Sequence, residues 1–170
     1  MFANCPNLKE IEFSNKLNTI NNYAVEWCPS ITSLEIPSNI KKIASSGIYN
    51  CRSLSNVILH EGLETIGSYV FNVCSLSKLH IPKSVTSIDY YALRNMPIHF
   101  KISVEEGNSN YDSRNNCNGI IEKAHVNGYY DGLRWGYNDT DLNAAGVGFL
   151  SYAYYNCNFE EGTEFIIPDF

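Results

Sequence analysis

Four cysteines recur at one fixed spacing in the first half of the chain. Cys5, Cys28, Cys51 and Cys74 follow one another at intervals of 23 residues. An apolar residue stands three positions before each cysteine, and an apolar triplet spaced L-x-x-L-x-L follows each one. A second apolar pair completes every copy: Leu17/Ile20, Ile40/Ile43, Leu63/Ile66 and Val85/Ile88. Self-similarity at such a period is the signature of repeat architectures, so this spacing constrains the fold more than any other feature.

The repeat predicts a solenoid in which each copy forms one coil. The x-L-x-L part alternates apolar and polar residues with period two, which is typical of a short strand with one buried face. A single coil cannot bury its apolar side alone, so stability has to come from stacking. The period of 22–23 lies in the leucine-rich-repeat range. We therefore expect a curved, right-handed leucine-rich-repeat solenoid of about six or seven coils, made mainly of short β-strands and turns and formally of the α/β class.

The cysteines allow two interpretations. There are six, and an even count in a secreted chain suggests disulfides. Four of them share one repeat position, however, and Met96 stands at that position in the next copy. We predict a ladder of small buried thiols, with bridging between stacked neighbours as the alternative. No C-x-x-C or C-x-x-H pairing occurs, so we expect no metal.

Charge and hydropathy exclude several classes of function. Twelve Lys and Arg against 18 Asp and Glu give a net charge of −6, which argues against nucleic acid as a partner. No apolar run approaches the length of a membrane span. The first residues lack the basic and apolar segments of a secretion signal.

Two segments resemble the BspA-type (Treponema pallidum-type) leucine-rich repeat. They read CPSITSLEIPSNIKKI at residues 28–43 and CSLSKLHIPKSVTSI at residues 74–88. Residues 102–122 are similar to an insert found between repeats in gut-bacterial members. The resemblance implies a surface or secreted recognition protein, with adhesion to host matrix proteins or other cells as its proposed role. It implies no enzyme activity, no cofactor and no catalytic residues.

The resemblance covers residues 2–122, weakens over 123–150 and returns at 152–157 and 165–168. We expect one domain over residues 1–170, with regular repeats at 2–97, an irregular insert at 98–150 and a terminal repeat at 151–170. Both ends fall in mid-repeat without a polar capping unit. A fragment of a larger protein, an assembly through the ends and a small standalone relative therefore all stay open. The location stays open too: cell surface or secreted by resemblance, cytoplasmic by the missing signal.

One candidate site is a stripe on the strand face. His80 lies between the inward residues Leu79 and Ile81, so it should point outward. The equivalent positions in earlier copies are Glu12, Glu35 and Ile58. The stripe predicts a recognition surface or a weak cation site, and the alternative is an ordinary solvated strand face. The two glutamates would lie one coil apart, close enough for a carboxylate pair.

The other candidate site is aromatic. Tyr129, Tyr130, Trp135 and Tyr137 crowd into a short segment with Asn, Asp and Gly between them. Aromatic side chains with polar tips are typical of binding surfaces, and flat rings also suit sugar stacking. The alternative is that these rings close the core where the repeats become irregular.

No catalytic motif is present. The chain has no G-x-S-x-G, P-loop or G-x-G-x-x-G sequence. A hydrolase centred on Asp131, Asp139 and Asp141 would need a pocket and a carboxyl group with a raised pKa. The pattern Asn108-x-Asn110-x-Asp112 begins like a calcium loop but lacks its glycine and final glutamate.

The sequence therefore predicts a non-catalytic recognition or adhesion module that binds a protein or glycan, including host matrix, through an extended solenoid face. The main alternative is a structural module that self-associates through the solenoid ends, because an exposed strand edge templates pairing.

Overall fold

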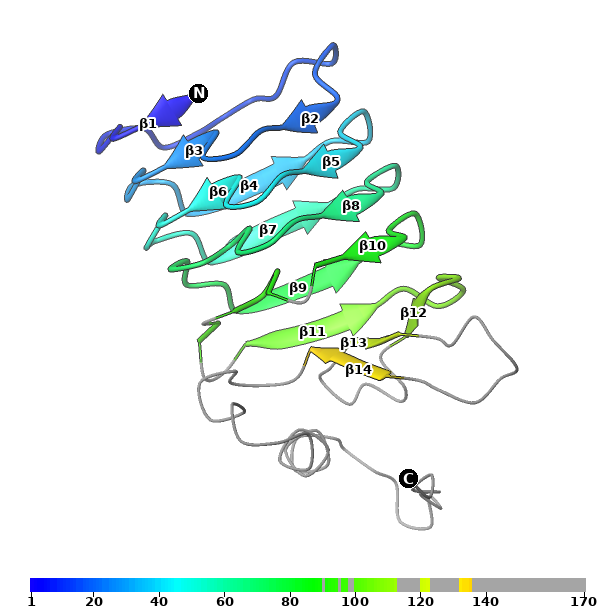
Figure 1. Cartoon of the computed structure of the whole chain (residues 1–170). Helices are drawn as coiled ribbons and strands as arrows, with labels where there is room; N and C mark the ends of the chain where they lie inside the picture. The colour runs from blue at the N-terminus through cyan, green and yellow to red at the C-terminus, as the bar shows by residue number, and fades with distance from the viewer. Residues whose placement is uncertain (90, 95, 98–99, 113–119, 123–131, 136–170) are drawn as a thin grey trace.

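The computed structural model describes residues 1–89, 91–94, 96–97, 100–112, 120–122 and 132–135. Successive coils stack on one another from the N-terminus onward (Figure 1). Each coil runs through short strands that pair in parallel with the same strands of the neighbouring coils. The predicted solenoid of short strands and turns is confirmed, and its described part contains no helix.

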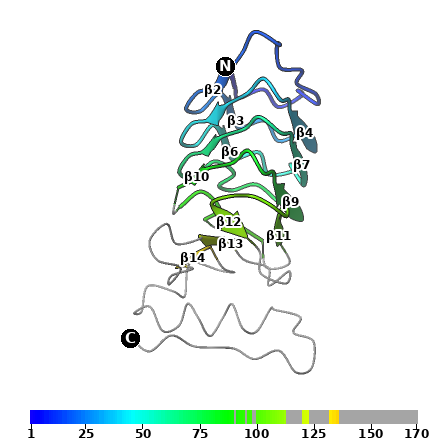
Figure 2. The same ribbon diagram turned by 90° about the vertical axis from the view of Figure 1, so that its right-hand side faces the viewer.

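Three parallel sheets form the sides of the solenoid. The long-strand side holds β4 (Ser33–Ile36), β7 (Asn56–Leu59), β9 (Lys78–Ile81) and β11 (Lys101–Val104). It runs down one edge of the stack in Figure 2. The short-strand side holds β2 (Thr19–Ile20), β5 (Lys42–Ile43), β8 (Thr65–Ile66) and β10 (Ser87–Ile88). The third side holds β1 (Phe2–Ala3), β3 (Val25–Glu26) and β6 (Ile48–Tyr49).

The core is built from columns of equivalent residues. Leu34 and Ile36 of β4 pair in register with Val57 and Leu59 of β7, and all four are buried. The residues between them on each strand are exposed or half-buried. This alternation is the one expected for a strand with a single buried face. Burial of these stacked columns, at roughly 25 cal/mol per Å² of apolar surface, is the main stabilising contribution.

The cysteine ladder lies inside this core. Cys28, Cys51 and Cys74 are buried free thiols, and Cys5 in the first coil is a half-buried one. Each buried sulfur approaches a backbone carbonyl of the preceding coil: Phe2 for Cys28, Val25 for Cys51 and Ile48 for Cys74, at 3.5, 3.9 and 3.9 Å. Met96 is also buried, as its place in the ladder predicts. The ladder is therefore packed as free thiols.

Two positions in each coil use left-handed backbone. The residue just before the cysteine has φ between 52° and 59° in four successive coils: Asn4, Trp27, Asn50 and Val73. A second set, Tyr23, Ser46 and Tyr69, has φ between 53° and 55°. Asn takes this conformation at low cost, whereas a bulky or β-branched residue is strained there. The repeat thus turns its corners at fixed places, whichever residue stands there.

Polar side chains join the coils at the turns that follow the long strands. Asn39 donates to the carbonyls of Ser14 and Leu17 in the coil before it. Asn108 is buried, and its amide nitrogen donates to the carbonyls of Pro82 and Val85 at 3.0 and 2.9 Å. Its amide oxygen accepts from the backbone of Asn110 and Tyr111. Asn108, the first residue of the calcium-like pattern, therefore uses its amide nitrogen to join two coils and its amide oxygen to stabilise its own turn.

The last described strands form a different sheet. β12 (Tyr111–Asp112), β13 (Ile120–Glu122) and β14 (Gly132–Trp135) pair in antiparallel fashion, with β13 in the centre. They begin soon after β11, which lies within the predicted insert and pairs in parallel with β9. The buried hydroxyl of Tyr111 accepts a hydrogen bond from the backbone of Ile88, which ties this sheet to the coil of β10.

Candidate functional site on the long-strand side

The outward residues of the long strands line up in columns. Glu35 pairs in register with Ile58, and His80 pairs with Ser103 on the other half of the sheet. Glu35, Ile58 and His80 are exposed, and Ile58 exposes 46% of its surface although it is apolar. The predicted outward direction of His80 is confirmed. The column also reaches Ser103, one coil beyond the predicted stripe.

Glu12, the first residue of the predicted stripe, is exposed and lies before β4 in a segment without regular secondary structure. Its predicted neighbour Glu35 accepts a hydrogen bond from Nε2 of His60, with Oε1 at 2.7 Å. The sequence missed this pair because His60 follows its strand and lies outside the column. Glu35 therefore faces an imidazole of the next coil.

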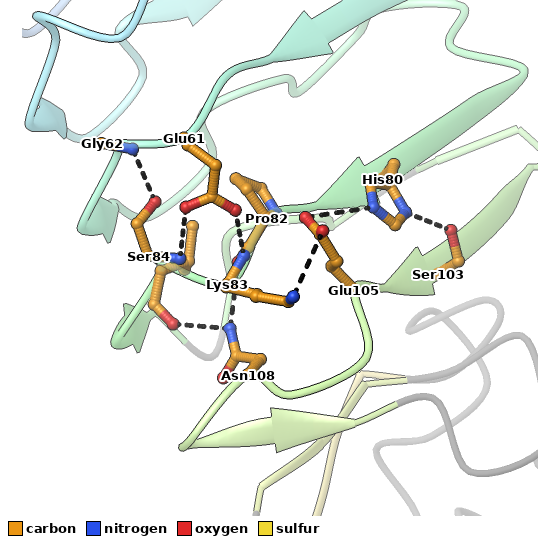
Figure 3. A network of polar contacts seen from close by, with 10 residues as sticks. Glu61, Gly62, His80, Pro82, Lys83, Ser84, Ser103, Glu105 and Asn108 are labelled. Carbon is orange, nitrogen blue, oxygen red and sulfur yellow. Dashed lines mark hydrogen bonds and ion pairs between the residues drawn. The ribbon is translucent and has the colours of Figure 1, made fainter.

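His80 lies between two partners on the exposed face. Its Nδ1 is 2.8 Å from Oγ of Ser103, and its Nε2 is 3.9 Å from a carboxylate oxygen of Glu105. The other oxygen of Glu105 is 3.8 Å from Nζ of Lys83. Figure 3 shows these side chains reaching toward one another across the coils. Such exposed ion pairs contribute little stability.

Glu61 extends the same network into the turn (Figure 3). Its two carboxylate oxygens accept hydrogen bonds from the backbone N–H groups of Lys83 and Ser84, at 2.8 and 3.2 Å. Slight burial raises the pKa of Glu61, but the hydrogen bonds from the backbone N–H groups of Lys83 and Ser84 outweigh it and lower the pKa below its ordinary value. Glu61 is thus held as a carboxylate that fixes the next coil.

The predicted aromatic cluster falls mostly outside the described residues. Tyr129, Tyr130 and Tyr137 lie there, together with Asp131, Asp139, Asp141, Cys117 and Cys157. Trp135 is the last residue of β14, where the structure describes the backbone alone.

An aromatic surface that the sequence analysis did not single out lies on the third side of the solenoid. Tyr23 and Tyr49 meet edge to face with ring centroids 5.8 Å apart, and Tyr69 stacks on Tyr91 at 5.5 Å. The guanidinium of Arg52 lies over Trp27, and that of Arg94 lies over Tyr91. We call this surface the aromatic side. Its signal in the sequence was the recurrence of Tyr23, Tyr69 and Tyr91 at multiples of the period.

No metal-binding cluster and no membrane-spanning element is found in the described part of the chain. There, no three side chains among His, Cys, Asp and Glu gather closely enough to hold an ion. Among the same residues no helix has the length and hydropathy needed to cross a bilayer.

The stacked parallel coils, the fixed period and the buried ladder define a protein of the solenoid repeat class. The family model described as the BspA type leucine rich repeat region matches residues 1–99 in six copies. The chain belongs to this family, as the motifs at residues 28–43 and 74–88 predicted. No curated protein matches the sequence.

A solved structure with a TM-score above 0.5 shares the architecture. The pneumococcal vaccine antigen PcpA is 23% identical over 69% of this chain, with a TM-score of 0.52, and the match spans 29% of the antigen. A leucine-rich repeat protein from Eubacterium ventriosum is 19% identical, with a TM-score of 0.41, over 64% of this chain and 37% of that one. The chain thus matches less than a third of the length of the antigen, and the likeness concerns the fold.

Proposed function

We propose that this chain is a non-catalytic recognition module that binds a protein or glycan through the long-strand side. The observation that carries the proposal is the column of exposed side chains formed by Glu35, Ile58 and His80. Four parallel strands hold this column over successive coils, which gives an extended contact surface. The family resemblance suggests a location at the cell surface. It also suggests host matrix proteins as candidate partners.

The chemistry of the column suits a polar ligand. Glu35 and His60 hold each other in place, as do His80 and Ser103, so their remaining hydrogen-bonding positions point from fixed sites. Ile58 lies between these two polar pairs as an exposed apolar contact. Preorganised groups of this kind reduce the ordering cost of binding. Hydroxyl groups of a glycan and backbone groups of a peptide are both suitable partners.

The test is a binding screen of the purified chain on a glycan array and a panel of extracellular-matrix proteins. A Glu35→Ala/His80→Ala double variant should lose the hits by about tenfold or more if the column is the site. Lys42→Ala, on the exposed face of the short-strand side, is the matched control and should keep them. Hits retained by the double variant but lost on replacing Tyr129, Tyr130, Trp135 and Tyr137 by Ala would move the site to the second predicted cluster. Hits retained by both variants would refute the proposal.

A second candidate function, self-association, rests on the first coil. Phe2 exposes 42% of its surface and Leu17 exposes 37%, whereas their equivalents Val25 and Ile40 are fully buried one coil later. Another coil stacked on this end would bury them. A mass that rises with concentration in light scattering, and falls back in a Phe2→Ser/Leu17→Ser variant, would support assembly through this end. A mass that does not change with concentration would contradict self-association through this end.

A further inference from the structure

The aromatic side differs in composition from the rest of the surface. Its described residues are 21–28, 44–52, 67–74, 89 and 91–94, which contain Tyr, Trp and Arg, two acidic residues (Glu26 and Asp89) and no Lys. The lysines of the described residues all lie elsewhere on the solenoid: Lys9, Lys16, Lys41, Lys42, Lys78, Lys83 and Lys101. Tyr, Trp and Arg are enriched at the centres of protein interfaces, and Lys is depleted there. The composition alone therefore separates this side from an ordinary solvated one.

The presence of Trp at position 27 is explained neither by a preference for its backbone conformation nor by burial in the core. It stands at the repeat position that Asn4 and Asn50 hold in the neighbouring coils, with φ of 52°. Asn adopts this left-handed conformation more readily than Trp, which is strained there. Trp27 also exposes 51% of its surface, and Tyr23, at φ of 53°, exposes 44%. Two large rings thus occupy strained corner positions while facing solvent, a combination that points to a surface role.

The guanidinium of Arg52 is held in place, and its charge remains available to a partner's carboxylate. Its Nε donates to the side chain of Asn50 at 3.0 Å, and its guanidinium lies 5.8 Å from the ring centroid of Trp27. Asn50 is itself buried. Among the described residues Arg52 meets no carboxylate within ion-pair distance, whereas Lys41 and Lys83 pair with Glu64 and Glu105. A preorganised guanidinium binds a carboxylate in a two-pronged fashion.

The rings also indicate which class of partner fits. Sugars stack on the open faces of aromatic rings, but here ring faces are already used within the solenoid. Tyr91 stacks on Tyr69 and carries Arg94 over its ring, and Trp27 carries Arg52. What remains for a partner is the exposed part of the Trp27 and Tyr23 rings beside the guanidinium of Arg52. Such a surface loses little conformational freedom on binding, which favours contact with another protein.

We propose that the aromatic side, centred on Trp27 and Arg52 with Tyr23 and Tyr49, binds a protein surface that presents a carboxylate beside apolar side chains. The carboxylate pairs with the guanidinium of Arg52, and the apolar groups pack against the exposed edges of Trp27 and Tyr23. This surface is separate from the column of Glu35 and His80, so the chain can bind two ligands by different sides.

The experiment selects peptides from a phage-displayed random library on the purified chain, and then measures synthetic copies by fluorescence polarisation. We expect selected sequences to carry Asp or Glu next to Leu, Ile or Phe. Their affinity for the chain should fall by about tenfold or more in Trp27→Asn and in Arg52→Lys. Arg52→Lys keeps the positive charge but loses the planar guanidinium that donates two parallel hydrogen bonds to a carboxylate. Peptides whose carboxylates are replaced by amides should weaken equally. Trp27→Asn carries the residue of the neighbouring coils, so the fold is retained.

Glu35→Ala and Lys42→Ala are the matched controls for the other two sides, and both should leave peptide binding unchanged. Failure to select any acidic peptide would overturn the inference, and so would equal binding to Trp27→Asn and to the unaltered chain. A glycan from the array whose binding disappears in Trp27→Asn would overturn it in favour of a sugar ligand. None of these results depends on the column of Glu35 and His80, so this inference and the proposed function can fail separately.

Discussion

Gly62 passes so close to the backbone carbonyl of Ser38, one coil earlier, that a side-chain carbon at position 62 would overlap it. Gly62 also has φ of +112°, a conformation that other residues rarely adopt. This turn of the third coil therefore combines a backbone requirement with a spatial one. Its neighbours in the stack, Asn39 and Ser84, use side chains to bond the preceding coil instead.

Replacing Gly62 by Ala should lower the free energy of unfolding by about 2–4 kcal/mol, because the overlap with backbone forces two coils apart. Gly107→Ala is the matched control. Gly107 also has positive φ, at +87°, but an added carbon there meets only the flexible side chain of Lys83. Gly107→Ala should therefore lower the free energy of unfolding by only about 1 kcal/mol. Equal losses in urea unfolding of the two variants would contradict the role of the Ser38 carbonyl.

Val73→Asn should raise the stability of the chain. Val73 is β-branched and sits at φ of 59°, while its equivalents Asn4 and Asn50 carry the residue that suits this backbone. Val73 exposes 37% of its surface, so Asn can be accommodated there with its amide facing solvent. We expect a gain of about 0.5–1 kcal/mol. The control is Ile58→Asn, an exposed strand position where the same kind of change should be neutral or destabilising. A lower melting temperature for Val73→Asn than for the unaltered chain would contradict the claim that Val73 is strained.

Glu61→Gln should destabilise the chain at neutral pH and lose that effect in acid. The pKa of Glu61 is lowered in the folded chain, so its carboxylate contributes stability above the ordinary pKa of a glutamate. That contribution disappears as the pH falls through the lowered pKa, where the carboxylate is protonated. The melting temperatures of the two chains should differ at pH 7 and converge below about pH 4. Glu64→Gln removes only an exposed pair with Lys41 and should change little at any pH.

The buried thiols of Cys28 and Cys74 should resist alkylation until the solenoid unfolds. Burial raises the pKa of the Cys28 thiol, and a hydrogen bond with Cys51 together with burial raises that of Cys74. Both groups therefore stay protonated at neutral pH, and the thiolate is the reactive form. In iodoacetamide labelling read by mass spectrometry, the half-buried Cys5 should react before Cys28 and Cys74. Cys28 and Cys74 should react only in denaturant. Rapid labelling of Cys74 in the native chain would contradict the packed ladder.

Part of the candidate site followed directly from the sequence. The alternation of Leu79, His80 and Ile81 predicted one exposed histidine between two buried residues, and the structure places them so. Alternation works here because a strand side chain has only two directions. The pairing of His60 with Glu35 could not be predicted in this way, since it depends on how the turn after β7 directs a residue across coils.

The solenoid follows from the repeat alone, because each copy carries the same apolar positions and no coil can bury them without its neighbours. The repeat also determined the buried cysteine ladder and the face on which Glu35, Ile58 and His80 lie. The contacts between residues on the aromatic side, in contrast, depend on the three-dimensional arrangement of the coils. Trp27 and Arg52 stand 25 positions apart in the chain, and the corner backbone of successive coils brings them together. The physical reason is that periodicity fixes which residues are buried, whereas the backbone angles at the corners fix where the exposed ones point.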